Sequence, residues 1–227
     1  MIEVLELRYT QAELAQVPEK ERLFYLMGTG LTNDLMTLLK LCAAAHRAVD
    51  EKREDRIATQ GSVTVHMLLL RLLAGRIWEG WRLIARDYGP IEKLYEEVLN
   101  DKAKQALVEL RSYFSKRRNL IATVRDKIGF HADKDIWKGA FNRIPSDVIL
   151  GDYLAINAPN TLYYSAETIH QVAILDWTGA DDLQVAVSTV IEDVQKQTFH
   201  IATFVYGFVE EFMDRHLKRQ LDEMKSS

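Results

Sequence analysis

Cysteine is nearly absent from this chain of 227 residues, and positive charge is not in surplus. The single cysteine, Cys42, excludes an intramolecular disulfide and any metal site built from several cysteines. It lies in the apolar run LLKLCAAA, which predicts a buried and unreactive thiol. The net charge of −4 gives no general attraction to nucleic acid or to an anionic membrane, so any site for a polyanion has to be local.

Other familiar sequence signals are also missing. The N-terminus, MIEVLELRYT, has no cationic start before an apolar core, so we do not expect it to be a secretory signal. The most apolar window, HMLLLRLLAGRIWEGW, contains Arg71, Arg76 and Glu79, which argues against a membrane span and leaves a cytoplasmic protein as the expectation. We find no internal repeat, glycine-rich phosphate loop, Gly-x-Ser-x-Gly motif or zinc-finger spacing.

Helical periodicity dominates the rest of the sequence. Hydrophobic residues make up 48% of the chain and charged residues 27%, as in ordinary globular proteins. Apolar residues recur every three or four positions in long stretches. This periodicity predicts helices over about 18–53, 62–88, 91–129 with a break near residue 100, 135–144, 165–177, and from 181 onward. Ser62 and Ser165 are the expected N-caps of two of them.

The segment DYLAINAPNTLYYS differs from this pattern. Two short apolar and aromatic runs flank the turn residues Asn157, Pro159 and Asn160, which is consistent with a small hairpin. The sequence therefore predicts an all-α fold, a bundle of long helices with a short irregular or hairpin insertion near 145–165. We expect residues 1–227 to form a single domain.

The stretch VRDKIGFH, residues 124–131, places side chains that carry chemistry at a helix end. At an ordinary helix end, Gly129 would act as a C-cap and His131 would bind the last carbonyl groups. The local charge favours a different interpretation. Between Arg111 and Lys127 there are six basic residues and one acid, a local charge of +5 in a chain of net −4. The six are Arg111, Lys116, Arg117, Arg118, Arg125 and Lys127. A cationic strip on an otherwise acidic chain favours a site for an anion.

The spacing within this stretch matters as well. In a continuous α-helix, six positions would rotate Arg125 and His131 roughly 120° away from each other. Gly129 lies between them and can break the helix, so that the segment with His131 folds back toward Arg125. Such a turn presents a guanidinium and an imidazole to one cleft.

The run R-D-K-I-G-F-H, Arg125 to His131, resembles the signature of the HEPN superfamily, an arginine, an adjacent polar residue and a histidine a few positions later. The run LLAGRIWEGWRLI followed by VRDKIGFHADKD is similar to abortive-infection and toxin-like bacterial HEPN-like proteins. The resemblance covers roughly residues 20–145, with helices over 165–225 completing the bundle. It implies an endoribonuclease that needs no metal or other cofactor, a homodimer, and control by an antitoxin or another regulatory protein.

The residue types suit cleavage of RNA by its own 2′-hydroxyl group. His131 is the candidate acid and base, since its ordinary pKa lets it exchange protons near neutrality. Arg125 can offer a permanently charged fork to the non-bridging phosphate oxygens. Asp126 would orient one of these two side chains. The candidates for substrate binding are Arg117, Arg118 and Lys127.

Glu79 lies beside the apolar stripe of its helix. It is either an exposed acid or a partner that holds Arg125. The run HADKD, residues 131–135, invites a metal site, but no second ligand cluster accompanies it, so we expect no metal. The alternative function is a non-catalytic helical module that binds RNA or a protein partner, with no contact to a membrane.

Overall fold

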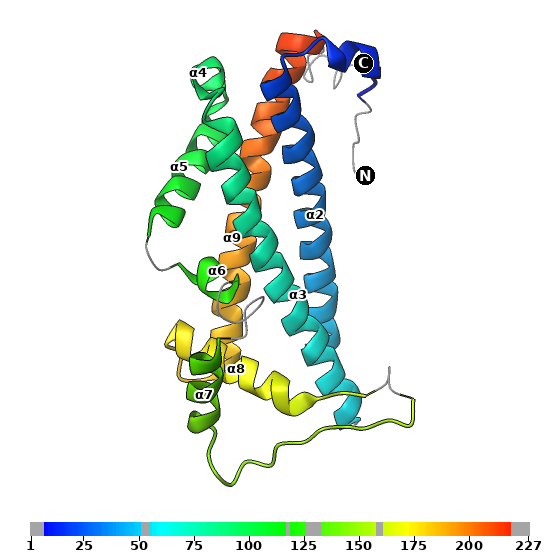
Figure 1. The fold of residues 1–227 in the computed structure, drawn as a ribbon, viewed down its shortest axis with the longest axis vertical. Helices are drawn as coiled ribbons and strands as arrows, with labels where there is room; N and C mark the ends of the chain where they lie inside the picture. Colours follow the sequence, from blue (N-terminus) through cyan, green and yellow to red (C-terminus); the bar gives the residue numbers. More distant parts are fainter. Residues whose placement is uncertain (1–6, 51–54, 117–118, 126–132, 158–160, 219–227) are drawn as a thin grey trace. The chain divides into compact units, whose positions relative to one another are not determined.

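The computed structural model describes residues 7–50, 55–116, 119–125, 133–157 and 161–218 (Figure 1). Within these ranges the chain is helical, and its only β-type pairing is an isolated antiparallel bridge between Tyr153 and Leu162. The predicted all-α fold is therefore confirmed. The insertion near 145–165 is irregular, and the predicted hairpin is reduced to this one bridge.

The helices differ widely in length, from four residues to more than thirty. In order they are α1 (Gln11–Ala15), α2 (Glu19–Asp50), α3 (Arg56–Leu83), the π-helix η1 (Ile84–Tyr88), α4 (Glu92–Tyr95), α5 (Asp101–Ser115), α6 (Leu120–Thr123), α7 (Lys134–Arg143), α8 (Tyr164–Thr178), α9 (Leu183–Phe212) and the π-helix η4 (Met213–Leu217). The two Gly residues early in α2, Gly28 and Gly30, do not split that helix.

The described residues divide between two compact units. Unit 1 takes its residues from Met1–Asn33, Glu79–Ser115 and Phe199–Ser227, and unit 2 from Asp34–Trp78 and Lys116–Thr198. Helices α2, α3 and α9 each contribute one segment to each unit. That residues 1–227 form one domain stays a prediction.

Aromatic side chains fill the core of unit 1. The ring of Phe24 meets the ring of Phe208 edge to face at a centroid distance of 4.7 Å. Tyr25 stacks on Phe212 at 4.3 Å, and Tyr88 packs on Phe204 at 4.9 Å. These pairs add favourable ring contacts to the burial of large apolar surfaces.

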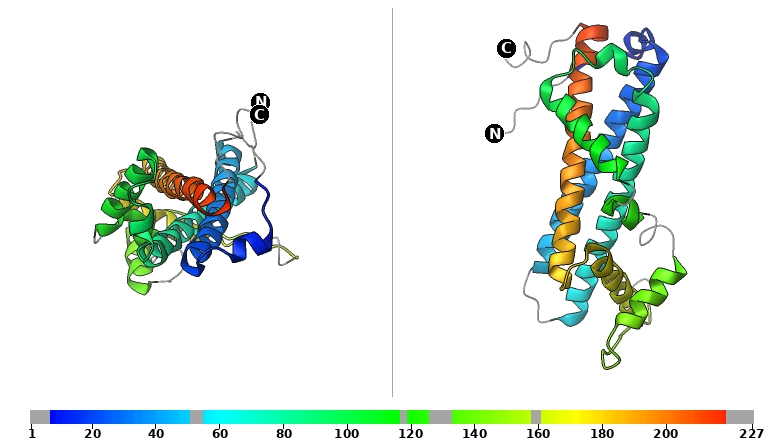
Figure 2. Two further views of the ribbon diagram at one scale, coloured as in Figure 1. Left: turned by 90° about the horizontal axis from the view of Figure 1, so that it is seen from above. Right: turned by 90° about the vertical axis from the view of Figure 1, so that its left-hand side faces the viewer.

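Aliphatic side chains fill the core of unit 2. Those less than 2% exposed include Leu35, Leu70, Leu73, Ile77, Ile121 and Val190. Helix α7 packs against α8, and α6 also contacts α8 (Figure 2). Helix α8 thus holds two short helices that are separate in the sequence.

Two predicted N-caps are wrong, and Asp side chains replace both. Helix α3 begins earlier than predicted because Asp55 accepts a hydrogen bond from the Ile57 amide at 2.8 Å, while the Ser62 hydroxyl donates to the carbonyl of Ala58. At α8, the amide and hydroxyl of Ser165 both donate to Asp152 Oδ1, at 3.0 and 2.7 Å. A side chain of the insertion therefore caps α8.

The predicted third helix, residues 91–129, is not continuous. The break near residue 100 is confirmed, since Asn100 accepts from the Ala103 amide at 2.8 Å and caps α5. A second break follows Ser115, where α5 ends. Asn119 then accepts from the Ala122 amide at 2.8 Å and begins α6. The Asn side chains compete with the helix for backbone donors and favour a new start.

Gly207 of α9 sits where unit 1 leaves no room for a side chain. A Cβ atom added there would overlap the Cβ atom of Ala103, whereas a Cβ at Gly139 of α7 would meet nothing within 4 Å. We expect Gly207→Ala to lower the free energy of unfolding by about 1–3 kcal/mol because the helices must separate. Gly139→Ala, the matched control, should raise it by about 0.4–1 kcal/mol. Urea unfolding measures both changes, and equal effects of the two substitutions would contradict the close contact.

Candidate functional site

The described part of the predicted motif is its first residue, Arg125. Helix α6 starts at the buried cap Asn119 and ends at Thr123, and the backbone is π-helical at Val124 and Arg125. Val124 is buried and Arg125 is half-buried. Short π-helical turns are frequent at functional sites, since they shift side chains away from the ordinary helical register.

Five predicted site residues lie outside the described residues. They are Arg117, Arg118, Asp126, Lys127 and His131. The convergence of Arg125 and His131 on one cleft therefore stays a prediction. What the structure describes is the helix on either side of the motif, α6 before it and α7 after it.

Glu79 has a partner on its own helix. Its Oε1 lies 4.0 Å from Arg82 Nη1, and both side chains are exposed. Glu79 belongs to unit 1 and Arg125 to unit 2, so the predicted support of Arg125 by Glu79 is not tested.

The cationic strip is weaker than its sequence indicates. Arg111 Nη2 donates to Glu92 Oε1 at 2.6 Å. Glu92 precedes the strip in the sequence, and its carboxylate offsets one of the six positive charges. Of the other described members, Lys116 is exposed and Arg125 half-buried.

The acids after the motif serve as helix caps. Asp133 Oδ1 accepts from the amides of Asp135 and Ile136 at 3.0 and 3.4 Å and starts α7. Among the described residues, no group of three or more His, Cys, Asp or Glu side chains is placed to hold a metal ion. That catalysis would need no metal stays a prediction.

A buried ion pair joins α3 to α8 in unit 2. Arg71 Nη1 donates to Glu167 Oε1 at 2.9 Å and Nη2 donates to Oε2 at 3.3 Å, a two-bond geometry in which the side chains are 9% and 5% exposed. Charge-assisted bonds of this forked kind are strong and directional. The pair fixes where α8 lies on α3.

His170, one turn further along α8, extends this polar cluster. Its Nδ1 lies 3.6 Å from Glu167 Oε2, and its ring meets the Trp137 ring of α7 at 4.9 Å. Burial by itself would raise the pKa of Glu167, but the nearby His170 ring and the hydrogen bonds from Arg71 outweigh it and lower the pKa.

Helical periodicity does not identify this cluster, although the sequence contains one signal of it. Met67, Leu70 and Ala74 form the apolar stripe of α3, and Arg71 lies four residues from Met67 on the same face. An arginine on a core-facing stripe is rarely buried without a carboxylate partner. Glu167, which sits 96 positions away, cannot be chosen as that partner from periodicity.

Unit 1 holds a second buried polar cluster. The Tyr95 hydroxyl donates to Glu21 Oε2 at 2.5 Å, and His216 Nε2 lies 2.7 Å from the same oxygen. Burial, together with the hydrogen bond to Glu21, raises the pKa of Tyr95 above its usual range. Arg215 lies over the Tyr95 ring at 5.0 Å from its centroid. This cluster ties α2 to α4 and η4.

One helical stretch, Arg56–Tyr95, is long and apolar enough to cross a membrane by length and composition, and 33% of its most apolar window is buried. Core helices of soluble proteins share these properties. The buried Arg71 of this stretch is paired within the protein. The cytoplasmic location stays a prediction.

No protein family, curated protein or solved structure matches this chain. The resemblance to the HEPN superfamily therefore rests on the motif and its helical context.

Breaking the Arg71–Glu167 pair should be costly. We expect Arg71→Met or Glu167→Leu alone to lower the free energy of unfolding by about 3–5 kcal/mol, because each leaves an unpaired buried charge. The double substitution should return most of that loss. Urea unfolding of the three variants gives the coupling energy. Additive losses in the double variant would argue against a direct interaction.

The lowered pKa of Glu167 predicts a dependence of stability on pH. Because the folded-state pKa lies below the usual 4.5, the carboxylate stabilises the fold above that value, and this contribution is lost as pH falls through the folded-state pKa. Unfolding free energies measured from about pH 7 to pH 3 should fall less steeply below about pH 4.5 for Glu167→Gln than for the parent. Glu192→Gln, which removes an exposed acid of α9, is the matched control for the loss of one carboxylate.

Proposed function

We propose that this chain is a HEPN-like, metal-independent endoribonuclease that works as a homodimer, as a toxin or phage-defence effector under the control of an antitoxin or other regulatory protein. One observation carries the proposal. The motif lies between α6 and α7, and both helices contact α8. The helices on either side of the motif thus contact one helix, which supports a fixed position for Arg125.

The proposed reaction gives a role to each charged candidate residue and to His131. The 2′-hydroxyl of RNA attacks the adjacent phosphorus, and the bond to the 5′-oxygen of the next nucleotide breaks. His131 takes or gives the proton of these oxygens. Arg125 stabilises the charge that builds on the non-bridging oxygens. Asp126 orients one of the two, and Arg117, Arg118 and Lys127 contact the RNA backbone.

A single motif supplies one imidazole, whereas the reaction needs both an acid and a base. A symmetric dimer would bring two motifs to one cleft, and twofold symmetry is the commonest arrangement of oligomers. The homodimer is proposed from the resemblance, and a shared cleft would supply both groups.

RNA cleavage in the presence of EDTA tests the proposal. The purified protein should cleave a mixed RNA, and Arg125→Ala should lower the rate by about 10²–10³-fold, since it removes a preorganised donor. His131→Ala should lower the rate of cleavage by at least as much. Arg125→Lys keeps the charge but loses the fork, so it should also be slow. Lys138→Ala removes an exposed cation from α7 and should cleave like the parent.

Co-expression of the parent chain with a differently tagged His131→Ala chain tests the shared cleft. The purified heterodimer keeps one imidazole, so it should lose nearly all activity, as the His131→Ala homodimer does. A heterodimer with half of the parental activity would contradict a cleft shared between two chains. RNA binding without cleavage by the parent would overturn the nuclease and support the non-catalytic binding module.

A further inference from the structure

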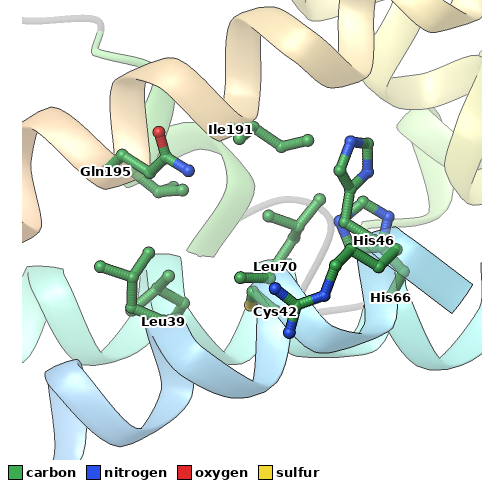
Figure 3. A pocket seen from close by; sticks show the side chains of 11 residues that line it. Leu39, Cys42, His46, His66, Leu70, Ile191 and Gln195 are labelled. Carbon is green, nitrogen blue, oxygen red and sulfur yellow. The ribbon is translucent and has the colours of Figure 1, made fainter.

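Unit 2 contains two adjoining cavities that no step of RNA cleavage uses. One has a volume of about 230 Å³ and lies among α2, α3 and α9 (Figure 3). The other has a volume of about 540 Å³ and is also lined by Gln171 of α8. The larger volume falls within the roughly 300–1,000 Å³ of small-molecule sites. His46 and His66 line both cavities.

The smaller cavity is an apolar slot. Its apolar lining comes from all three helices, with Leu39 and Cys42 on α2, Leu70 on α3 and Ile191 on α9 pointing toward the same space in Figure 3. Leu73 and Val194 complete this lining. Burial of the Cys42 thiol raises its pKa to about 11, so the slot holds a neutral thiol at physiological pH. A slot of this kind fits a short alkyl chain or a ring.

The larger cavity is the polar compartment of the two. Its lining includes Gln171, Gln184 and Ser188, whose amide and hydroxyl groups can donate hydrogen bonds. The rings of His46 and His66 lie 5.0 Å apart at the wall shared with the apolar slot. Polar donors thus stand at one end of an apolar space, an arrangement that suits a ligand with a polar head and an apolar tail.

The charge of the lining identifies the head group. None of the described residues that line either cavity is an Asp or Glu, although the chain has 33 acids and a net charge of −4. Among these lining residues, Arg47 carries a positive charge, and the rings of His46 and His66 can each donate a hydrogen bond. A carboxylate is the head group that gains from every one of these side chains.

We propose that unit 2 binds a medium-chain organic carboxylate, with its alkyl tail in the apolar slot and its carboxylate beside His46 and His66. The site lies on α2, α3, α8 and α9 and does not depend on the proposed ribonuclease activity. The protein can bind the acid whether or not it cleaves RNA, and it can cleave RNA whether or not it binds the acid.

Equilibrium dialysis of the full-length protein with radiolabelled octanoate tests this proposal. We expect saturable binding of one octanoate per chain, and octan-1-ol, which has a comparable tail and a neutral head, should compete at least tenfold less well. Arg47→Gln should raise the dissociation constant of octanoate. It should leave the inhibition constant of octan-1-ol unchanged, because the alcohol has no charge. Absence of saturable octanoate binding, or equal competition by the alcohol, would overturn the proposal.

A matched pair of variants tests the position of the tail. Ala43 and Ala44 are consecutive exposed residues of α2, and only Ala43 lines the slot. Ala43→Phe should weaken octanoate binding at least tenfold by filling the slot, while Ala44→Phe should bind like the parent. Gln195→Phe, which enters the slot from α9, provides a second block if Ala43→Phe does not fold. Parental binding by folded Ala43→Phe and Gln195→Phe would overturn the assignment.

Discussion

The ion pair between Arg71 and Glu167 is the contact on which the arrangement of unit 2 depends. It lies inside the protein and joins the long helix α3 to α8 through two hydrogen bonds. Helices α6 and α7 contact α8 in turn, and the segment with the Arg125 motif connects those two helices. The placement of the two helices that flank the candidate site therefore depends on a guanidinium and a carboxylate of other helices.

A buried pair of this kind is an unusual way to gain stability, since apolar side chains of similar volume often do as well. The advantage of the pair is that its hydrogen bonds are directional. Apolar faces of α3 and α8 can slide past one another at small cost, whereas the forked bonds hold at one register. His170 adds a link from Glu167 to Trp137 of α7, so the same carboxylate helps to hold α7. We regard positional specificity as the reason for this pair.

Periodicity in the sequence was enough to predict the all-α fold and the long helices. Apolar residues that recur every three or four positions lie on one face only if the segment is helical. The ends of helices were harder to predict. Asp152 caps α8 from the insertion, 13 positions before Ser165, and no local pattern contains that information. Asn119, by contrast, is an ordinary local cap, and the apolar residues that continue past it concealed the break.

The candidate site could be predicted only as far as its own segment. The stretch Arg125 to His131 contains the chemistry, but the partners that shape its surroundings come from distant helices. Glu92 offsets Arg111, and Glu167 accepts from Arg71, across 19 and 96 positions of sequence. Counting charges in a sequence window therefore overstates the local positive potential, since ion pairs form in space.

The two units differ in packing, and this difference has a bearing on function. Unit 1 stacks large rings and brings α9 so close to α5 that Gly207 leaves no space for a methyl group. Unit 2 has an aliphatic core, a buried ion pair and two cavities. Close-packed interiors resist change, whereas cavities permit binding. We therefore expect ligand binding in unit 2, where the imidazole-lined cavities lie and to which Arg125 belongs.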